Sequence, residues 1–191
     1  ASLSGIVRPD AILATNTSYL DPDVIAEVVQ GPERLIGLHF FSPVDRMGLV
    51  EIIKGEKTSA AALAVALDFV AKLRKTPIVV NDSRGFYTSR VFQTLIHEGA
   101  AMLAEGVPPA VIENTAKAVG MPVGPLALLD ELTFDLPLKI VDQAIEQEGD
   151  RYVLPAGVAV LRKMKANGRS SKKEGAGFYD SPAEGGKHLW K

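Results

Sequence analysis

The sequence predicts an α/β region followed by an all-helical region. In the first region, short runs rich in β-branched residues alternate with stretches of helical periodicity, as is typical of α/β folds. Beyond Gly85 the strand-like runs stop, and long helical patterns separated by Gly and Pro follow. The periodicity breaks at residues 81–84, so we expect domains at residues 1–83 and 84–191. With 191 residues, 47% of them hydrophobic, the chain can bury one large core or two small ones.

Local patterns define the elements of the first region. The best-defined helix is expected over 59–74, because Thr58 or Ser59 can cap its start and apolar residues recur at helical spacing. A shorter helical pattern lies at 23–30. The strand-like runs are 11–15, 35–40, 49–53 and 77–80.

Five helical patterns make up most of the second region. They cover residues 87–104, 108–119, 125–132, 135–147 and 158–165, and Gly or Pro separates most of them. The last stretch, 172–191, is rich in Gly and charged residues. We expect a loop or tail there, with Phe178, Tyr179 and Trp190 as anchors.

Composition argues against several kinds of function. The formal net charge is -2, and Gly and Ser interrupt the only concentrated basic segment, 162–173, which argues against nucleic acid as the main partner. The chain has no cysteine and three histidines, so we expect no disulfide and no metal site. No apolar stretch approaches the roughly 20 residues that cross a bilayer. We expect a cytoplasmic protein, which agrees with the absence of cysteine.

Polar residues at the ends of apolar strands mark a candidate site. Asn16 and Ser18 follow the first strand, where open α/β sheets bind ligands, although both could instead build a turn and cap the next helix. His39 ends the next strand, and Glu51 interrupts the apolar run after it. A buried carboxylate is costly unless it is paired. If the two strands are neighbours, Glu51 would orient His39 as a general base; a satisfied core histidine and a structural ion pair are the alternatives.

Six motifs together carry a family resemblance. They are NTS at 16–18, HFFSP at 39–43, LVEII at 49–53, GFYTSR at 85–90, MPVGP at 121–125 with LD at 129–130, and KEGAGFY at 173–179. In this order and spacing, over about residues 12–179, they resemble the L-3-hydroxyacyl-CoA dehydrogenase family. Two stretches narrow the resemblance: the motif GFYTSR at 85–90, and LAEGV at 103–107, where the helical pattern ends. Both are most similar to the dehydrogenase part of multifunctional fatty-acid β-oxidation α-subunits.

The resemblance implies oxidation of the C3 hydroxyl of an L-3-hydroxyacyl-CoA, with NAD as cofactor. Residues 1–83 would be the distal half of a Rossmann-like NAD domain, and residues 84–191 the helical C-terminal domain of the family. His39 would take the hydroxyl proton and Glu51 would orient and support it. Ser18 would hydrogen-bond the reacting oxygen near the nicotinamide ring.

Four further polar residues stand at positions where family members contact the cofactor or the substrate. The resemblance implies cofactor contacts for Asn16, Ser42 and Lys173 beside Ser18, and a substrate contact for Ser89. A solvated lysine is the alternative reading of Lys173. Ser89 stands where many members carry Asn, so a short hydroxyl replaces a longer amide, and a bridging water could fill the gap.

One family feature is missing from residues 1–191. The motif G-x-G-x-x-G, with an acidic residue about 20 positions later, holds the pyrophosphate and ribose of the cofactor. We therefore expect the chain to be a fragment that lacks the first NAD-binding half and that binds NAD poorly alone. The expected partners are an acyl-CoA substrate and a second copy or a thiolase subunit. The alternatives are a fragment of a monofunctional 3-hydroxybutyryl-CoA dehydrogenase and a non-catalytic oligomerisation module.

Overall fold

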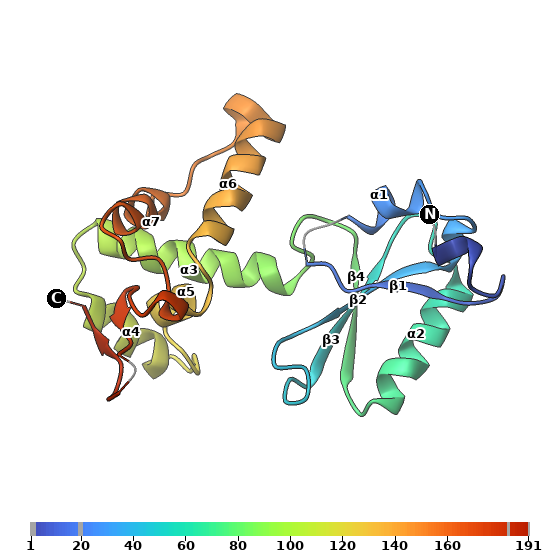
Figure 1. Ribbon diagram of the computed structural model, residues 1–191, viewed down its shortest axis with the longest axis horizontal. Helices are drawn as coiled ribbons and strands as arrows, with labels where there is room; N and C mark the ends of the chain where they lie inside the picture. Colours follow the sequence, from blue (N-terminus) through green and yellow to red (C-terminus); the bar gives the residue numbers. More distant parts are fainter. Residues whose placement is uncertain (1–2, 19–20, 183, 191) are drawn as a thin grey trace. The chain divides into compact units, whose positions relative to one another are not determined.

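The computed structural model describes residues 3–18, 21–182 and 184–190 (Figure 1). The chain divides into two compact units, Ala1–Val91 and Phe92–Lys191. This division lies within helix α3 (Thr88–Ala104), a few residues after the boundary expected from the sequence, and the domain limits 1–83 and 84–191 stay a prediction. No helix in the described part of the chain is long and apolar enough to cross a membrane.

The first unit is built on a four-stranded sheet in the order β1-β2-β3-β4. β1 (Leu13–Thr15) is parallel to β2 (Leu35–Phe40), and β3 (Leu49–Lys54) is parallel to β4 (Thr76–Asn81). The two pairs join through the antiparallel contact of β2 with β3, which the short connection 41–48 permits. The predicted strands are confirmed.

Helix α2 (Ala60–Lys72) lies along one face of this sheet (Figure 1) and contacts β2, β3 and β4. Of the two predicted caps, Thr58 and Ser59, the structure has Ser59, whose hydroxyl oxygen accepts the Ala62 N–H at 3.1 Å. Ala62, Ala66 and Val70 recur every four residues and are buried, and Ala66 and Val70 pack against the apolar side chains of β2 and β3. The sheet therefore has one well-covered face, and its central strands are buried.

Helix α1 (Pro22–Ala26) is shorter than the pattern at 23–30 predicts. The Val28 N–H bonds to the Ile25 carbonyl three residues back, which tightens the chain and ends the helix. Gly31 then takes a left-handed conformation, with φ of 71°, before a short 3₁₀ turn, Pro32–Arg34. Other 3₁₀ turns lie at Leu3–Gly5, Gly149–Arg151 and Lys172–Glu174.

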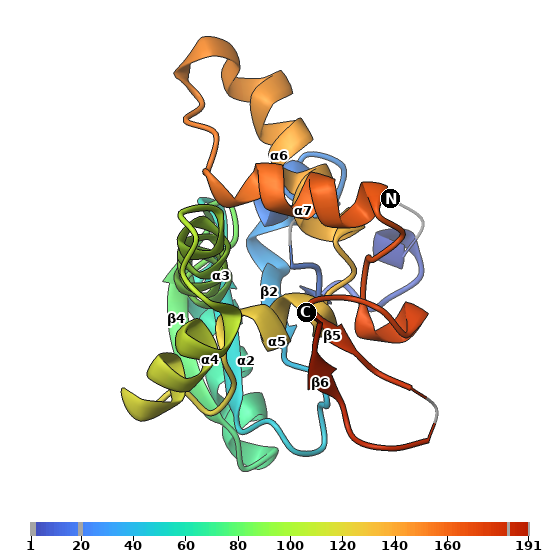
Figure 2. The same ribbon diagram turned by 90° about the vertical axis from the view of Figure 1, so that its left-hand side faces the viewer.

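The second unit consists mainly of helices around an apolar core, as predicted. After α3 come α4 (Pro109–Ala118), α5 (Pro125–Glu131), α6 (Asp135–Glu148) and α7 (Gly157–Ala166). Figure 2 shows α5 near the centre of this unit, with the C-terminal strands beside it. Fully buried side chains at the core include Ile96, Leu126, Leu129, Phe134 and Leu161.

The expectation of a loop or tail at 172–191 is wrong in one respect. Strands β5 (Tyr179–Asp180) and β6 (His188–Leu189) form an antiparallel pair, and Phe178 and Tyr179 are buried in the core of the unit. Asp130 explains the attachment, since its carboxylate accepts the N–H groups of Phe178 and Tyr179, both at 2.7 Å. The expected aromatic anchors at 178 and 179 are thus real, and a buried carboxylate fixes their backbone.

Candidate active site

His39 and Glu51 form a buried hydrogen-bonded pair. The antiparallel register of β2 and β3 sets the two residues directly opposite each other. The His39 Nδ1–H donates to Glu51 Oε2 at 2.7 Å, and the side chains are 7% and 0% exposed. Because an ionised carboxylate only accepts hydrogen bonds, Nδ1 carries a proton, and in the neutral imidazole Nε2 then keeps its lone pair. The pairing of His39 with Glu51 was predicted on the condition that their strands are neighbours, and β2 and β3 meet this condition.

The second oxygen of Glu51 binds the start of α3. Glu51 Oε1 accepts the backbone N–H of Tyr87 at 3.1 Å and of Thr88 at 2.8 Å. The positive end of a helix dipole and two N–H donors therefore compensate a carboxylate that has no contact with water. No sequence pattern predicted these donors, although the motif GFYTSR at 85–90 marks the beginning of the helix that supplies them.

Ser18 completes a chain of three side chains. Its Oγ lies 3.0 Å from His39 Nε2, and since that nitrogen carries the free lone pair, the hydroxyl donates to it. Ser18 lies just beyond the end of β1, and the adjacent β2 carries His39. The hydrogen-bonded side chains of Ser18, His39 and Glu51 thus lead from the carboxyl end of β1 into the buried part of the sheet.

Asn16 has a structural contact at the same edge. Its Oδ1 accepts the N–H of Phe40 at 2.8 Å, which fastens the end of β1 to the end of β2. This contact positions the turn that leads to Ser18. A role of Asn16 in binding the cofactor stays a prediction.

The other predicted site residues occupy three different places. Ser42 is exposed in the connection after β2, and Ser89 is half-buried in the first turn of α3, in the same unit as His39. Lys173 is exposed in a 3₁₀ turn of the second unit. The described contacts bring together Ser18, His39 and Glu51, whereas the roles of Ser42, Ser89 and Lys173 stay predictions.

The residues at this sheet edge fit the reacting end of a nicotinamide cofactor. β1 and β2 are parallel, and the polar groups of Asn16, Ser18 and His39 lie at their carboxyl ends, where open sheets bind ligands. A pyrophosphate requires a Gly-rich turn that lets the backbone approach it closely. The turns after β1, β2 and β3 are not Gly-rich, so these turns do not form a pyrophosphate cradle.

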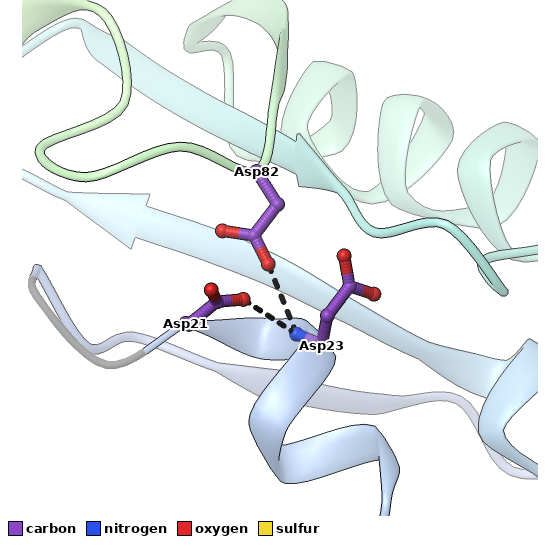
Figure 3. Close-up of side chains that lie close together, drawn as sticks. All are labelled: Asp21, Asp23 and Asp82. Carbon is purple, nitrogen blue, oxygen red and sulfur yellow. Dashed lines mark hydrogen bonds between the residues drawn. The ribbon is translucent and has the colours of Figure 1, made fainter.

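A second polar cluster in the first unit consists of Asp21, Asp23 and Asp82 (Figure 3). Asp21 Oδ1 and Asp82 Oδ2 both accept the backbone N–H of Asp23 at 2.9 Å. One oxygen of each carboxylate lies within 4.8 Å of the others, beside a cleft of about 320 Å³ that Lys54 and Glu56 also line. No sequence pattern predicted this cluster, and the absence of a metal site stays a prediction.

Burial, and then the hydrogen bond with Asp21, raise the pKa of Asp82 to about 7. The folded state therefore holds a proton on Asp82 that the unfolded chain, with a pKa of 3.8, releases at lower pH. The resulting stabilisation is complete below about pH 4 and is lost as pH rises through about 7.

We expect the free energy of unfolding to fall between about pH 4 and pH 7 because Asp82 ionises. The loss should be about 1–2 kcal/mol, after allowance for solvent screening of this half-buried carboxylate. Asp82→Asn, which mimics the protonated form, should match the wild type at low pH and exceed it at high pH. Urea unfolding across this range measures the difference, and parallel curves for the two proteins would contradict the expectation.

Comparison with known families places the chain in the hydroxyacyl-CoA dehydrogenase class, which agrees with its fold. Residues 1–83 match the family model "3-hydroxyacyl-CoA dehydrogenase, NAD binding domain", and residues 85–181 match "3-hydroxyacyl-CoA dehydrogenase, C-terminal domain". The chain belongs to the 3-hydroxyacyl-CoA dehydrogenase family. The resemblance identified from the six motifs is confirmed.

Two curated relatives and two solved structures illustrate the similarity. The "Fatty acid oxidation complex subunit alpha" of Shewanella loihica is 41% identical over 93% of this chain, and that of Shewanella halifaxensis is 42% identical over 88%. The chain spans 25% and 23% of the lengths of these relatives. The (S)-3-hydroxybutyryl-CoA dehydrogenase of Ralstonia eutropha is 35% identical, with a TM-score of 0.86 over 95% of this chain and 64% of its own. The 3-hydroxybutyryl-CoA dehydrogenase of Escherichia coli is 32% identical, with a TM-score of 0.86 over 97% of this chain and 40% of its own.

Proposed function

We propose that this chain carries the proton-handling part of an active site that oxidises L-3-hydroxyacyl-CoA to 3-oxoacyl-CoA. The observation that carries the proposal is the hydrogen-bonded chain from Ser18 through His39 to the buried Glu51. A neutral imidazole with a free Nε2 and a carboxylate on Nδ1 is equipped to accept a proton and to bear the resulting charge. Family membership supplies the matching reaction class.

Each residue has a defined part in the proposed reaction. NAD, when bound, accepts the hydride from C3 of the substrate. As the C–H bond breaks and the C=O bond forms, His39 Nε2 takes the hydroxyl proton. In this step the Ser18 hydroxyl turns from Nε2 to the reacting oxygen, which leaves the Nε2 lone pair to the substrate proton and holds that oxygen within reach of Nε2. Glu51 keeps the imidazole in the required tautomer and balances the positive charge of the imidazolium.

The proposal also covers contacts with the cofactor and the substrate, the metabolic role and the assembly. Asn16, Ser42 and Lys173 are proposed to contact the cofactor, and Ser89 is proposed to contact the substrate. The Shewanella relatives are subunits of fatty acid oxidation complexes, which supports a place for this chain in fatty-acid β-oxidation, in the cytoplasm. Its proposed assembly is with a second copy or with a thiolase subunit.

The proposal predicts NADH formation from L-3-hydroxybutyryl-CoA and from longer L-3-hydroxyacyl-CoA thioesters. The assay uses the natural polypeptide that contains this sequence, with NAD, and follows NADH absorbance. The D-enantiomers serve as the matched control, since the base and the hydride acceptor can face only one configuration at C3. Absence of turnover for every L-substrate, or equal rates for both enantiomers, would refute the proposal.

A further inference from the structure

The chain takes an unusual backbone path just before α3. Gly85 and Phe86 are both in the left-handed region, with φ of 72° and 48°. Among the residues that the structure describes, Phe86 and Arg74 are the two non-glycine residues with positive φ. A bulky L-residue rarely adopts this conformation, and such strain is most often kept at functional sites.

The left-handed pair determines where the next two N–H groups point. The Phe86 N–H closes a turn onto the Ser83 carbonyl at 2.8 Å. The following N–H groups, of Tyr87 and Thr88, then converge on Glu51 Oε1. Since both donors bind the same oxygen, Oε2 is left for His39. The turn thus fixes the orientation of the Glu51 carboxylate, with one oxygen on the two N–H groups and the other on the imidazole.

The Phe86 side chain also packs beside the candidate site. It is 4% exposed, and its ring centroid lies 5.8 Å from that of His39. The Phe41 ring lies on the same imidazole at 4.6 Å. Packing alone would explain a phenylalanine at position 86, but it would not explain the left-handed backbone, because an apolar side chain can fill space from an unstrained position.

We propose that Phe86 is a positioning residue whose left-handed backbone aims the N–H groups of Tyr87 and Thr88 at Glu51 and so holds Glu51 against His39. This inference rests on the proposed function, in which His39 is the base. Phe86 acts through Glu51 and does not touch the reacting atoms.

The test compares Phe86→Gly with Phe86→Ala in the natural polypeptide. Both variants remove the ring, but glycine adopts positive φ freely and alanine does not. We expect Phe86→Ala to lose about tenfold more kcat/KM than Phe86→Gly, the size of effect that follows loss of a hydrogen bond to a charged group. A packing role predicts the reverse order, because glycine removes more contact and adds backbone freedom to the unfolded chain.

A second readout does not depend on turnover. The ring signals of His39 can be titrated by NMR, with His97 and His188 as internal references, in the wild type and in both variants. His39 is faced by the carboxylate of Glu51, the hydroxyl of Ser18 and the two phenylalanine rings. We expect its titration midpoint to change more in Phe86→Ala than in Phe86→Gly.

Arg74 offers the matched control. It has φ of 57° and lies exposed in the turn after α2. Arg74→Gly and Arg74→Ala repeat the same backbone comparison away from the site, so they should differ in stability but not in kcat/KM or in the His39 titration. If neither Phe86 variant folds, Phe86→Asn and Phe86→Val fill more of the space and give the same contrast, since Asn tolerates positive φ and Val does not.

The outcomes separate this inference from the proposed function. If wild-type protein forms no NADH from any L-substrate, the proposed function fails, and the NMR titration still tests the positioning of Glu51. If the wild type is active but Phe86→Ala equals or exceeds Phe86→Gly in kcat/KM, the inference fails and the function stands. An unchanged His39 titration in both variants would also overturn the inference.

Discussion

Replacing His39 by alanine is expected to lower kcat/KM for NADH formation by about 100-fold or more. The imidazole is the group whose free nitrogen faces the site, and Ser18 Oγ, 3.0 Å away, has no comparable basicity. Without His39, the hydroxyl proton must pass to water while the hydride leaves. The variant also leaves Glu51 without one of its hydrogen-bond donors, which adds an electrostatic penalty in the same place.

The control for this experiment is another histidine of the chain. His188 is exposed on β6 in the second unit, and its Nε2 lies 3.4 Å from Asp180 Oδ2. His188→Ala therefore removes an imidazole without changing the candidate site. His188→Ala should keep kcat/KM close to the wild-type value. If His39→Ala retains activity within about tenfold of the wild type, His39 is not the general base. Circular dichroism of both variants shows whether a loss of activity reflects unfolding.

The pairing of His39 with Glu51 could be predicted from the sequence for a clear physical reason. A charged residue inside an apolar strand is costly unless it has a partner, and few residues of the first region could serve. The sequence did not show that the two strands are neighbours, and the register of β2 and β3 supplies that. The two N–H donors at Tyr87 and Thr88 could not be predicted this way, because their direction depends on the positive φ of Phe86, which no composition pattern indicates.

The five helices of the second region were predictable because each has its own periodicity and its own Gly or Pro boundary. The burial of Tyr179 was not, since 172–191 is rich in Gly and charge and has no periodicity of its own. Its position depends on Asp130, nearly fifty residues earlier in the chain. A Cβ at Gly177 would overlap the Asp130 carboxylate, and one at Gly124 would overlap Glu113, so the close approaches of these glycines explain two of the six motifs.

Glu113 is expected to be a major source of stability in the second unit, and Glu113→Ala should lower the free energy of unfolding by about 3–5 kcal/mol. Its side chain is fully buried, with Oε1 accepting the Leu126 N–H at 2.8 Å at the start of α5. Oε2 accepts the Tyr179 hydroxyl at 2.6 Å. Burial and the Glu113 carboxylate both raise the pKa of Tyr179, so this hydroxyl stays protonated and donates. Alanine would leave both donors without a partner in a dry core.

Three further variants distinguish the contribution of the Glu113 hydrogen bonds from that of ordinary packing. Tyr179→Phe removes only the donor to Oε2 and should cost about 1–2 kcal/mol. Glu113→Gln keeps an acceptor for the Leu126 N–H and should cost less than Glu113→Ala. Glu146, exposed on α6, provides the matched control, and Glu146→Ala should change stability by no more than about 0.5 kcal/mol. Urea unfolding measures the free energy of unfolding of all four variants. If Glu113→Ala loses no more stability than Glu146→Ala, the Glu113 carboxylate does not join α5 to the C-terminal strands. A double-mutant cycle with Tyr179→Phe then isolates the hydroxyl–carboxylate contact, because only residues that share this bond should depart from additivity.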